Sequence, residues 1–190
     1  MVCQVIGLGG RLRAGKDCIA DYLVAERGFV KIGMSDALHE AMLALDPIVD
    51  VGPLYGDIEF ERYSDVVAQV GYVEAKKNPE VRRLLQRLGT EVGRAMIGEN
   101  VRVDITARKI ERLLAEGHSV ALSGVRFENE LRMIHSFAGR TVWVERTSLN
   151  PTPEAVHASE VSLGPQDFDL TIVNDGSLAD LYARVDTLLG

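Results

Sequence analysis

An apolar run near the N-terminus leads directly into a glycine-rich loop and then into a segment of helical period. The loop reads GGRLRAGKDC over residues 9–18, and from Gly10 its spacing is G-x-x-x-x-G-K. A strand, such a loop and a helix together direct backbone N–H groups and the positive end of the helix at one place. The pattern therefore predicts a phosphate-binding loop in which Lys16 reaches the outer phosphates. Asp17 stands where the standard motif has the Ser or Thr that contacts magnesium.

Two other interpretations of this loop are disfavoured. A glycine-rich turn without a ligand would not need the seven-residue spacing, the upstream strand and the amphipathic helix to agree. A dinucleotide fingerprint that starts at Gly7 would need a glycine at position 12, where the chain has Leu12.

The rest of the chain alternates short β-rich runs with longer stretches of helical period, which is typical of a parallel sheet covered by helices. The expected strands are residues 2–8, 29–33, 118–123, 140–145 and 170–173. The expected helices are residues 16–27, 36–45, 61–70, 79–97, 101–116, 127–138 and 178–189. Residues 47–56 are expected to form a loop, and residues 147–166 a mobile excursion of the lid type. We therefore expect an α/β fold with a five-stranded parallel sheet flanked by helices.

Composition narrows the class of ligand. The 190 residues carry a net charge of -7, which argues against a nucleic-acid polymer as partner. A small anion held by a few local cations remains compatible with that charge. Neither a signal peptide nor a membrane helix is expected, so the prediction is a cytoplasmic protein. The two cysteines, Cys3 and Cys18, have no metal-ligand spacing.

A row of arginines marks the expected helix 79–97. At 100° per residue an apolar sector that includes Val92, Ala95 and Met96 lies opposite a polar stripe. The stripe consists of Arg83, Arg87, Thr90 and Arg94. Arginine forks suit a second phosphate group, and a solvated face paired with nearby glutamates is the open alternative.

A second group of charged residues, VRFENE, follows the expected strand 118–123. Ligands in open α/β sheets lie at the carboxyl ends of the strands, so Arg126 is a binding candidate. Glu128 and Glu130 have an alternative role, because acidic side chains also stabilise the start of a helix.

These motifs, with HASE at 157–160 and DLTIVNDGSLADL at 169–181, resemble the deoxynucleoside monophosphate kinases of tailed bacteriophages. The resemblance runs from the loop to the last helix and includes the loop form S/A-G-K-D, here Ala14 to Asp17. It implies a three-layer P-loop kinase fold in one domain over residues 1–190, with an acceptor-binding helical insertion at about 46–100 and a lid at about 147–166. It also implies transfer of the γ-phosphoryl group of ATP to a deoxynucleoside 5′-monophosphate, with Mg²⁺ as cofactor. Small nucleotides are the implied partners, and a homodimer is suggested.

The resemblance and the sequence patterns together give expected roles for individual residues. The expected catalytic residues are Lys16, Arg126 and Asp17, and Asp17 is also expected to bind the metal through water. The expected ATP-binding residues are Gly10, Arg13, Ala14, Gly15, Lys16, Asp17, Cys18, Arg146, Asn174 and Gly176. The expected acceptor-binding residues are Asp36, Arg83, Arg87, Gly89, Thr90, Arg102, Asp104, Arg126 and Glu130.

Two positions depart from the family pattern. Gly124 replaces the acidic residue of the D-x-R element, and Arg102 replaces a tryptophan after the acceptor helix. Because the G-K-D loop is shared more widely than the acceptor helix, a P-loop kinase for another small acceptor, such as dephospho-coenzyme A or phosphomevalonate, stays open. Gly124 also keeps open a nucleotide-binding module without catalysis.

Overall fold

A computed structural model describes residues 3–52, 60–147 and 162–189 of the chain. These residues form two compact units, Met1–Met34 with Thr106–Gly190, and Ser35–Ile105. Most of the expected lid, residues 148–161 with the HASE segment, lies outside the described residues.

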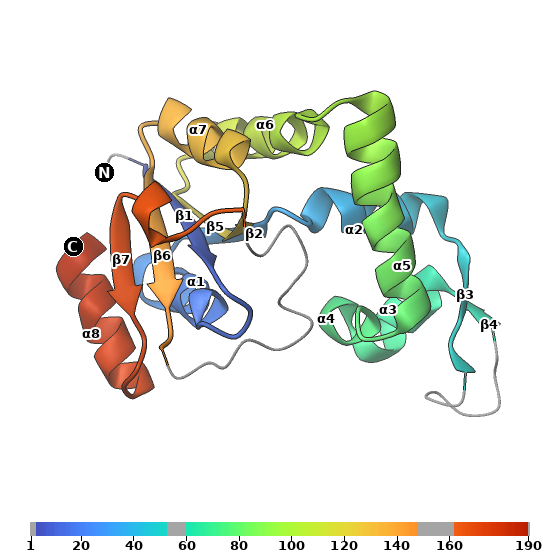
Figure 1. Ribbon diagram of the computed structural model, residues 1–190, viewed down its shortest axis with the longest axis horizontal. Coiled ribbons are helices and arrows are strands. Elements are labelled where there is room, and N and C mark those ends of the chain that lie inside the picture. Colours follow the sequence, from blue (N-terminus) through green and yellow to red (C-terminus); the bar gives the residue numbers. More distant parts are fainter. Residues whose placement is uncertain (1–2, 53–59, 148–161, 190) are drawn as a thin grey trace. The chain divides into compact units, whose positions relative to one another are not determined.

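The first unit is built on a five-stranded parallel sheet (Figure 1). Its strands are β1 (Val5–Gly10), β2 (Val30–Gly33), β5 (Val120–Val125), β6 (Arg140–Glu145) and β7 (Leu170–Val173). They lie in the order β2-β5-β1-β6-β7, which confirms the expected parallel sheet. The first strand ends two residues later than expected, because Gly9 and Gly10 still pair with Trp143 and Val144 of β6.

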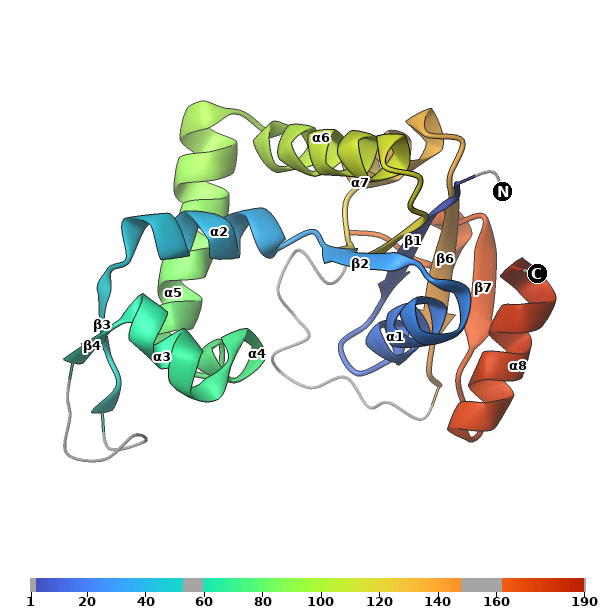
Figure 2. The same ribbon diagram turned by 180° about the vertical axis from the view of Figure 1, so that it is seen from behind.

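Helices cover both faces of this sheet, so the unit has three layers (Figures 1 and 2). α1 (Lys16–Arg27) and α8 (Leu178–Leu189) pack on one face, where Ile19, Leu23, Leu181 and Val185 join the strand residues in one buried core. α6 (Val101–Ala115) and α7 (Glu128–Ser136) lie over the other face. Burial of these apolar side chains supplies the main stabilisation of the layers.

Close packing on the α7 face explains two glycines in β1. A Cβ added to Gly7 would lie 2.3 Å from a side-chain carbon of Ile134, and one added to Gly9 would lie 2.2 Å from the Phe168 ring. Only glycine therefore lets α7 and Phe168 approach the central strand this closely.

The second unit contains four α-helices, a β-hairpin and a π-helix among its described residues. They are α2 (Asp36–Leu45), β3 (Ile48–Asp50), β4 (Phe60–Arg62), α3 (Tyr63–Val70), α4 (Tyr72–Ala75), α5 (Pro79–Arg87) and the π-helix η2 (Leu88–Ile97). Its own buried core joins side chains from these elements, among them Met42, Val49, Tyr63, Val66, Val81 and Leu85.

The prediction of a loop over residues 47–56 is wrong in part. Ile48–Asp50 forms a strand that pairs antiparallel with Phe60–Arg62, and the helix expected from residue 61 begins at Tyr63 instead. Val49 is buried between exposed Ile48 and Asp50. An alternation of only three residues is too short to distinguish from a loop by pattern.

The expected helix 79–97 exists, but its second half is a π-helix. The Gly98 N–H donates to the Gly93 carbonyl, five residues back. This wider turn changes which side chains share a face. Gly89 and Gly93 are buried, whereas Val92, Ala95 and Met96 are exposed, so the expected apolar sector is wrong beyond Leu88.

Candidate functional site

The glycine-rich loop joins β1 to α1 through residues in the left-handed backbone region. Gly10 has φ of 140°, Arg13 of 64° and Gly15 of 106°. A Cβ on Gly10 would lie 2.4 Å from the Val144 carbonyl oxygen, so the strand to loop transition needs glycine there. Where residues in the right-handed and left-handed regions alternate, the backbone curves and its N–H groups point to one side. Such a concavity favours the binding of anions.

Lys16 lies over this loop. Lys16 as a whole is only 7% exposed, and its Nζ donates a hydrogen bond of 3.3 Å to the Arg11 carbonyl oxygen. An ammonium has three donors, so Lys16 can place positive charge over the loop while the carbonyl occupies one of them.

Residues from the loop, the start of α1, the segment after β6 and the β7–α8 connection line a cleft of about 280 Å³. The lining residues are Arg13, Gly15, Lys16, Asp17, Cys18, Arg146, Asn174, Gly176 and Leu178. The structure thus brings together eight of the ten expected ATP-binding residues, while Gly10 and Ala14 belong to the loop without lining the cleft. Three cationic side chains and one carboxylate in that lining favour an anionic ligand.

Asn174 fixes the loop from β7. Its side-chain Nδ2 donates a 2.8 Å hydrogen bond to the Ala14 carbonyl oxygen, and Asn174 is 9% exposed. A Cβ on Gly15 would lie 2.3 Å from the same Nδ2 atom, which leaves room only for glycine. Asn174 therefore lies beside the expected phosphate site as a residue that positions the loop.

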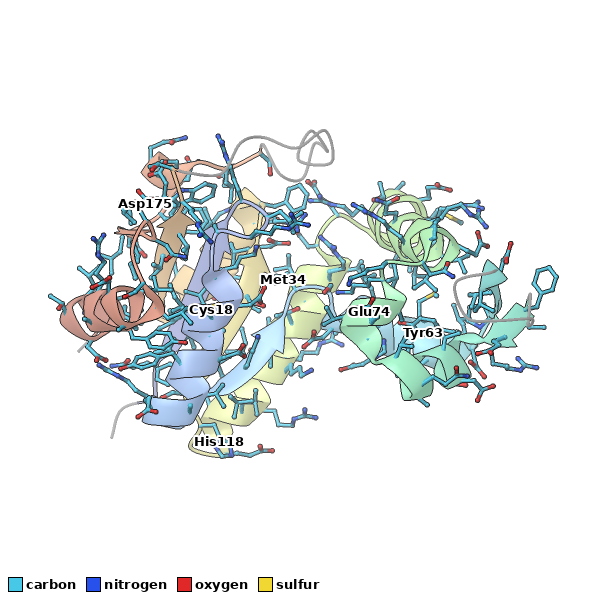
Figure 3. The ribbon with its side chains drawn as sticks, turned by 90° about the horizontal axis from the view of Figure 1, so that it is seen from below. Cys18, Met34, Tyr63, Glu74, His118 and Asp175 are labelled. Atoms are coloured by element: carbon cyan, nitrogen blue, oxygen red, sulfur yellow. The ribbon has the colours of Figure 1, made fainter. Side chains whose placement is uncertain are left out.

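Asp175, labelled in Figure 3, follows β7. Its carboxylate accepts hydrogen bonds from the Thr147 N–H at 2.9 Å and from the Thr147 hydroxyl at 2.7 Å, and so joins the segments that follow β6 and β7. Arg146 precedes Thr147, so this contact also fixes the backbone that carries Arg146 into the cleft. Sequence patterns missed Thr147, because nothing local distinguishes it from other threonines.

The carboxylate of Asp17 lies 3.7 Å from Lys31 Nζ, which is also 2.8 Å from Asp21. The interactions with these two aspartates outweigh burial and raise the pKa of Lys31. No local sequence pattern marks Lys31 as a neighbour of the loop, since Lys31 belongs to the separate strand β2.

At the end of β5, Glu130 caps α7. Glu130 is 1% exposed, and its Oε2 accepts hydrogen bonds from the Arg126 N–H at 2.7 Å and the Phe127 N–H at 3.2 Å. Of the two glutamates expected either to bind a ligand or to stabilise the start of the helix, Glu130 therefore has the second role. These two hydrogen bonds hold the backbone at Arg126 and Phe127 against the start of α7.

Gly124 lies at a bulge in β5. Leu8 pairs with Ser123, but the next pair joins Gly9 to Val125, so Gly124 is the extra residue, and its φ is 84°. Bulges of this type favour glycine in the left-handed region. An aspartate at this position would be strained, although no atom lies within 4 Å of an added Cβ.

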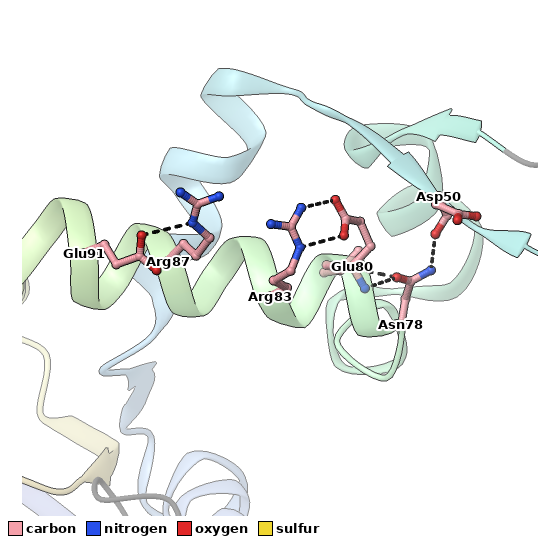
Figure 4. A network of polar contacts seen from close by, with 7 residues as sticks. Asp50, Asn78, Glu80, Arg83, Arg87 and Glu91 are labelled. Atoms are coloured by element: carbon pink, nitrogen blue, oxygen red, sulfur yellow. Dashed lines mark hydrogen bonds and ion pairs between the residues drawn. The ribbon is translucent and has the colours of Figure 1, made fainter.

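Arg83 and Arg87 of α5 are ion-paired on the surface of the second unit (Figure 4). Glu80 accepts from Arg83 Nε at 2.9 Å and Nη2 at 2.6 Å, and these hydrogen bonds lower the pKa of Glu80. Arg87 Nε lies 3.1 Å from Glu91. The structure thus shows Arg83 and Arg87 as members of a solvated face, with their charges partly neutralised.

The remaining expected acceptor residues are spread over the second unit. Asp36 begins α2, while Thr90 and Asp104 are exposed on η2 and α6. Gly89 is buried, and a Cβ there would lie 2.9 Å from Leu38 and 3.9 Å from an Arg102 guanidinium nitrogen. Among these residues the structure brings Gly89 and Arg102 together.

Within the described ranges, no group of three or more His, Cys, Asp or Glu side chains is placed to hold a metal ion. Mg²⁺ commonly binds through one or two carboxylates and substrate phosphates, so the single carboxylate of Asp17 in the cleft fits that mode. None of the described helices is both long enough and apolar enough to span a bilayer.

Comparison with known proteins gives a family match. The family model described as "Deoxynucleotide monophosphate kinase" matches residues 55–185, which is more than half of the chain and excludes the glycine-rich loop. A protein of Acanthamoeba polyphaga mimivirus, provisionally named a deoxynucleotide monophosphate kinase, is 24% identical over 95% of this chain and 93% of its own length. The deoxynucleotide monophosphate kinase of Escherichia phage RB69 is 26% identical over 57% of this chain and 44% of its own length.

A solved structure supports the fold. Dephospho-CoA kinase from Campylobacter jejuni superposes with a TM-score of 0.51 at 16% identity, over 100% of this chain and 97% of that one. At that identity the likeness concerns the fold alone, and it agrees with the loop and sheet described above. Together with the family match, these observations show that the chain belongs to the deoxynucleotide monophosphate kinase family, a family of nucleotide phosphotransferases.

Proposed function

We propose that this protein transfers the γ-phosphoryl group of ATP to a deoxynucleoside 5′-monophosphate. The observation that carries the proposal is the cleft beside the loop, which Arg13 and Lys16 of the loop line together with Arg146. That concentration of positive charge suits a triphosphate donor, and the family match supports a nucleotide acceptor.

The reaction is an in-line displacement. An oxygen of the acceptor monophosphate forms a bond to the γ-phosphorus, the bond from that phosphorus to the β,γ-bridging oxygen breaks, and ADP leaves with the electron pair. The chain supplies little covalent chemistry in such a step. Its residues align donor and acceptor and neutralise charge on the transferring group.

Residue roles follow from the site. The loop N–H groups and Lys16 hold the outer phosphates, Arg13 and Arg146 add charge at the cleft, and Asn174 keeps the loop in shape. Bound Mg²⁺ would neutralise phosphate charge, and Asp17 would hold its water ligands. Arg126 is proposed to contact the transferring group from the end of β5.

A panel of dAMP, dCMP, dGMP and dTMP with ATP and Mg²⁺ tests the proposal by ADP release that depends on the acceptor. We expect turnover with at least one acceptor, and Lys16→Ala should lower kcat by about a hundredfold or more, as for loss of one preorganised charge contact. Absence of turnover with all four acceptors would reject the proposal.

The same panel distinguishes the alternatives when dephospho-coenzyme A and phosphomevalonate are added. Turnover with one of these alone would indicate a P-loop kinase with another acceptor. Tight ATP binding by calorimetry, with no acceptor phosphorylated, would instead indicate a binding module without catalysis.

A further inference from the structure

Lys76 follows α4 in the second unit and is held by neutral groups. Its Nζ lies 3.7 Å from the centroid of the Tyr72 ring and 3.4 Å from the Ser35 hydroxyl oxygen. The Tyr72 hydroxyl in turn donates to the Ser35 carbonyl oxygen at 3.4 Å. Lys76 and Tyr72 are therefore both connected to the residue that precedes α2.

The ring beneath Lys76 is itself fixed in place. His39 of α2 stacks on Tyr72 with centroids 3.9 Å apart and planes inclined by 20°. A hydrogen bond of 2.8 Å joins His39 Nδ1 to the hydroxyl of Tyr63, which is fully buried in α3. Three elements of one unit thus preorganise the position of the ammonium, which lowers the entropy lost when it binds a ligand.

The charge of this cluster resides on Lys76 near neutral pH. Burial, followed by the positive charge of Lys76, lowers the pKa of His39, against the smaller opposing influence of Asp36 and Glu40. His39 is therefore neutral at pH 7, because its pKa lies below the usual 6.5.

No carboxylate of the described residues forms an ion pair with Lys76. The neighbouring basic residues differ in this respect: Lys77 pairs with Glu74 at 2.7 Å, Arg83 with Glu80 and Arg87 with Glu91. An anion that binds Lys76 displaces no carboxylate of the described ranges, whereas binding at either arginine competes with a glutamate.

Ser35 adds a second polar group to this position. Within the described part of the chain its side chain does not cap α2, although Ser35 occupies the N-cap position. A hydroxyl that accepts from Lys76 retains its own proton for donation to a ligand oxygen. One ammonium and one hydroxyl side by side match the oxygens of a single phosphate group.

We propose that Lys76 and the Ser35 hydroxyl bind the 5′-phosphate of the monophosphate acceptor. This inference rests on the proposed function and assigns its acceptor contact to residues that no motif in the sequence marked. It also gives Arg83 and Arg87 a surface role in place of the acceptor contact expected for them.

The test compares Lys76→Met with Lys77→Met. Both remove one ammonium from adjacent positions, but Lys77 is 70% exposed in its side chain and paired with Glu74. We expect Lys76→Met to raise KM for the acceptor roughly 10- to 100-fold, as for loss of a hydrogen bond between charged groups, and to leave KM for ATP unchanged. Lys77→Met should change neither value. Circular dichroism and thermal unfolding check that each variant is folded.

Equilibrium binding separates this inference from the proposed function. Calorimetric titration of wild type, Lys76→Met and Ser35→Ala with dAMP, dCMP, dGMP and dTMP should show the loss of affinity even where no turnover occurs. Absence of turnover by wild type would reject the proposed function alone. Equal affinity of wild type and Lys76→Met, or no binding of any of the four nucleotides to wild type, would overturn the inference.

Discussion

Asp17 directly follows the loop lysine and lies 3.7 Å from Lys31 Nζ, with its side chain 64% exposed. If its carboxylate holds water ligands of Mg²⁺, Asp17→Asn should raise the Mg²⁺ concentration for half-maximal velocity on the order of tenfold, the usual cost of losing an outer ligand. Titration of Mg²⁺ at saturating ATP measures this. Asp21→Asn is the matched control, because Asp21 also pairs with Lys31 at 2.8 Å but does not line the cleft. An equal Mg²⁺ requirement in wild type and Asp17→Asn would remove Asp17 from metal binding.

The surroundings of Asp17 show which features of the site sequence patterns predict and which they do not. The G-x-x-x-x-G-K spacing predicts the loop and the position of Lys16, because both are local. The contacts of Asp17 with Lys31 and of Asp175 with Thr147 join distant parts of the chain, and their residue types are common at surfaces. Nothing in the local sequence marks such partners. For Arg83 the helical stripe leaves two roles open, and its bidentate pairing with Glu80 agrees with the solvated face paired with nearby glutamates.

Between elements, Asn174 joins the end of β7 to the loop that follows β1. Asn174→Ala leaves the carbonyl oxygen of buried Ala14 without its 2.8 Å donor. We expect a loss of about 1–3 kcal/mol in the free energy of unfolding, since a buried acceptor is left unsatisfied. We also expect a higher KM for ATP, because the loop loses a fixed position. Thr171→Ala, at an exposed position of the same strand, is the control for denaturant unfolding. Equal stability of both variants would contradict a positioning role for Asn174.

Asp169 joins β6 to β7 at the opposite end of β7. Burial opposes its ionisation, but hydrogen bonds from the Thr141 N–H and hydroxyl and from His135 outweigh burial and lower the pKa of Asp169 below 3.8. The contribution of this carboxylate to stability is therefore complete above pH 3.8 and is lost as the pH falls through the lower folded value. Urea unfolding between pH 3 and pH 7 should show a steeper acid loss in wild type than in Asp169→Asn. Parallel curves would contradict this assignment.

Element boundaries show where periodicity succeeds and where it fails. Residues 16–27, 36–45 and 178–189 form helices with the expected ends, because each has an amphipathic repeat and a recognisable start or stop. The π-helix η2 escapes prediction, because a repeat analysed at 100° per residue presupposes α-helical hydrogen bonds. Its wider turn places Gly93 in the core and Met96 in solvent.

For the whole molecule, alternation of strands and helices predicts the parallel sheet, since each crossover helix must cover a buried strand. The same alternation does not predict the limits of the second unit. The resemblance implies an acceptor-binding insertion at about 46–100, which stays a prediction, and the compact unit of the structure runs over Ser35–Ile105. Its limits depend on contacts of α2 with α3 and α5, and spacing along the sequence contains no information about such contacts.

Each unit has its own hydrophobic core, and the two cores share no residue, so we predict that the units open separately. Val81→Ala removes a fully buried side chain from the core that contains Tyr63 and should cost about 1–3 kcal/mol by creating a cavity. Native-state hydrogen exchange should show this loss in the amides of α3 and α5 and leave those of β1 and β5 unchanged. Val142→Ala, equally buried in the sheet core, should give the reverse pattern. A uniform loss of protection across both units in either variant would show that the chain opens as one cooperative body.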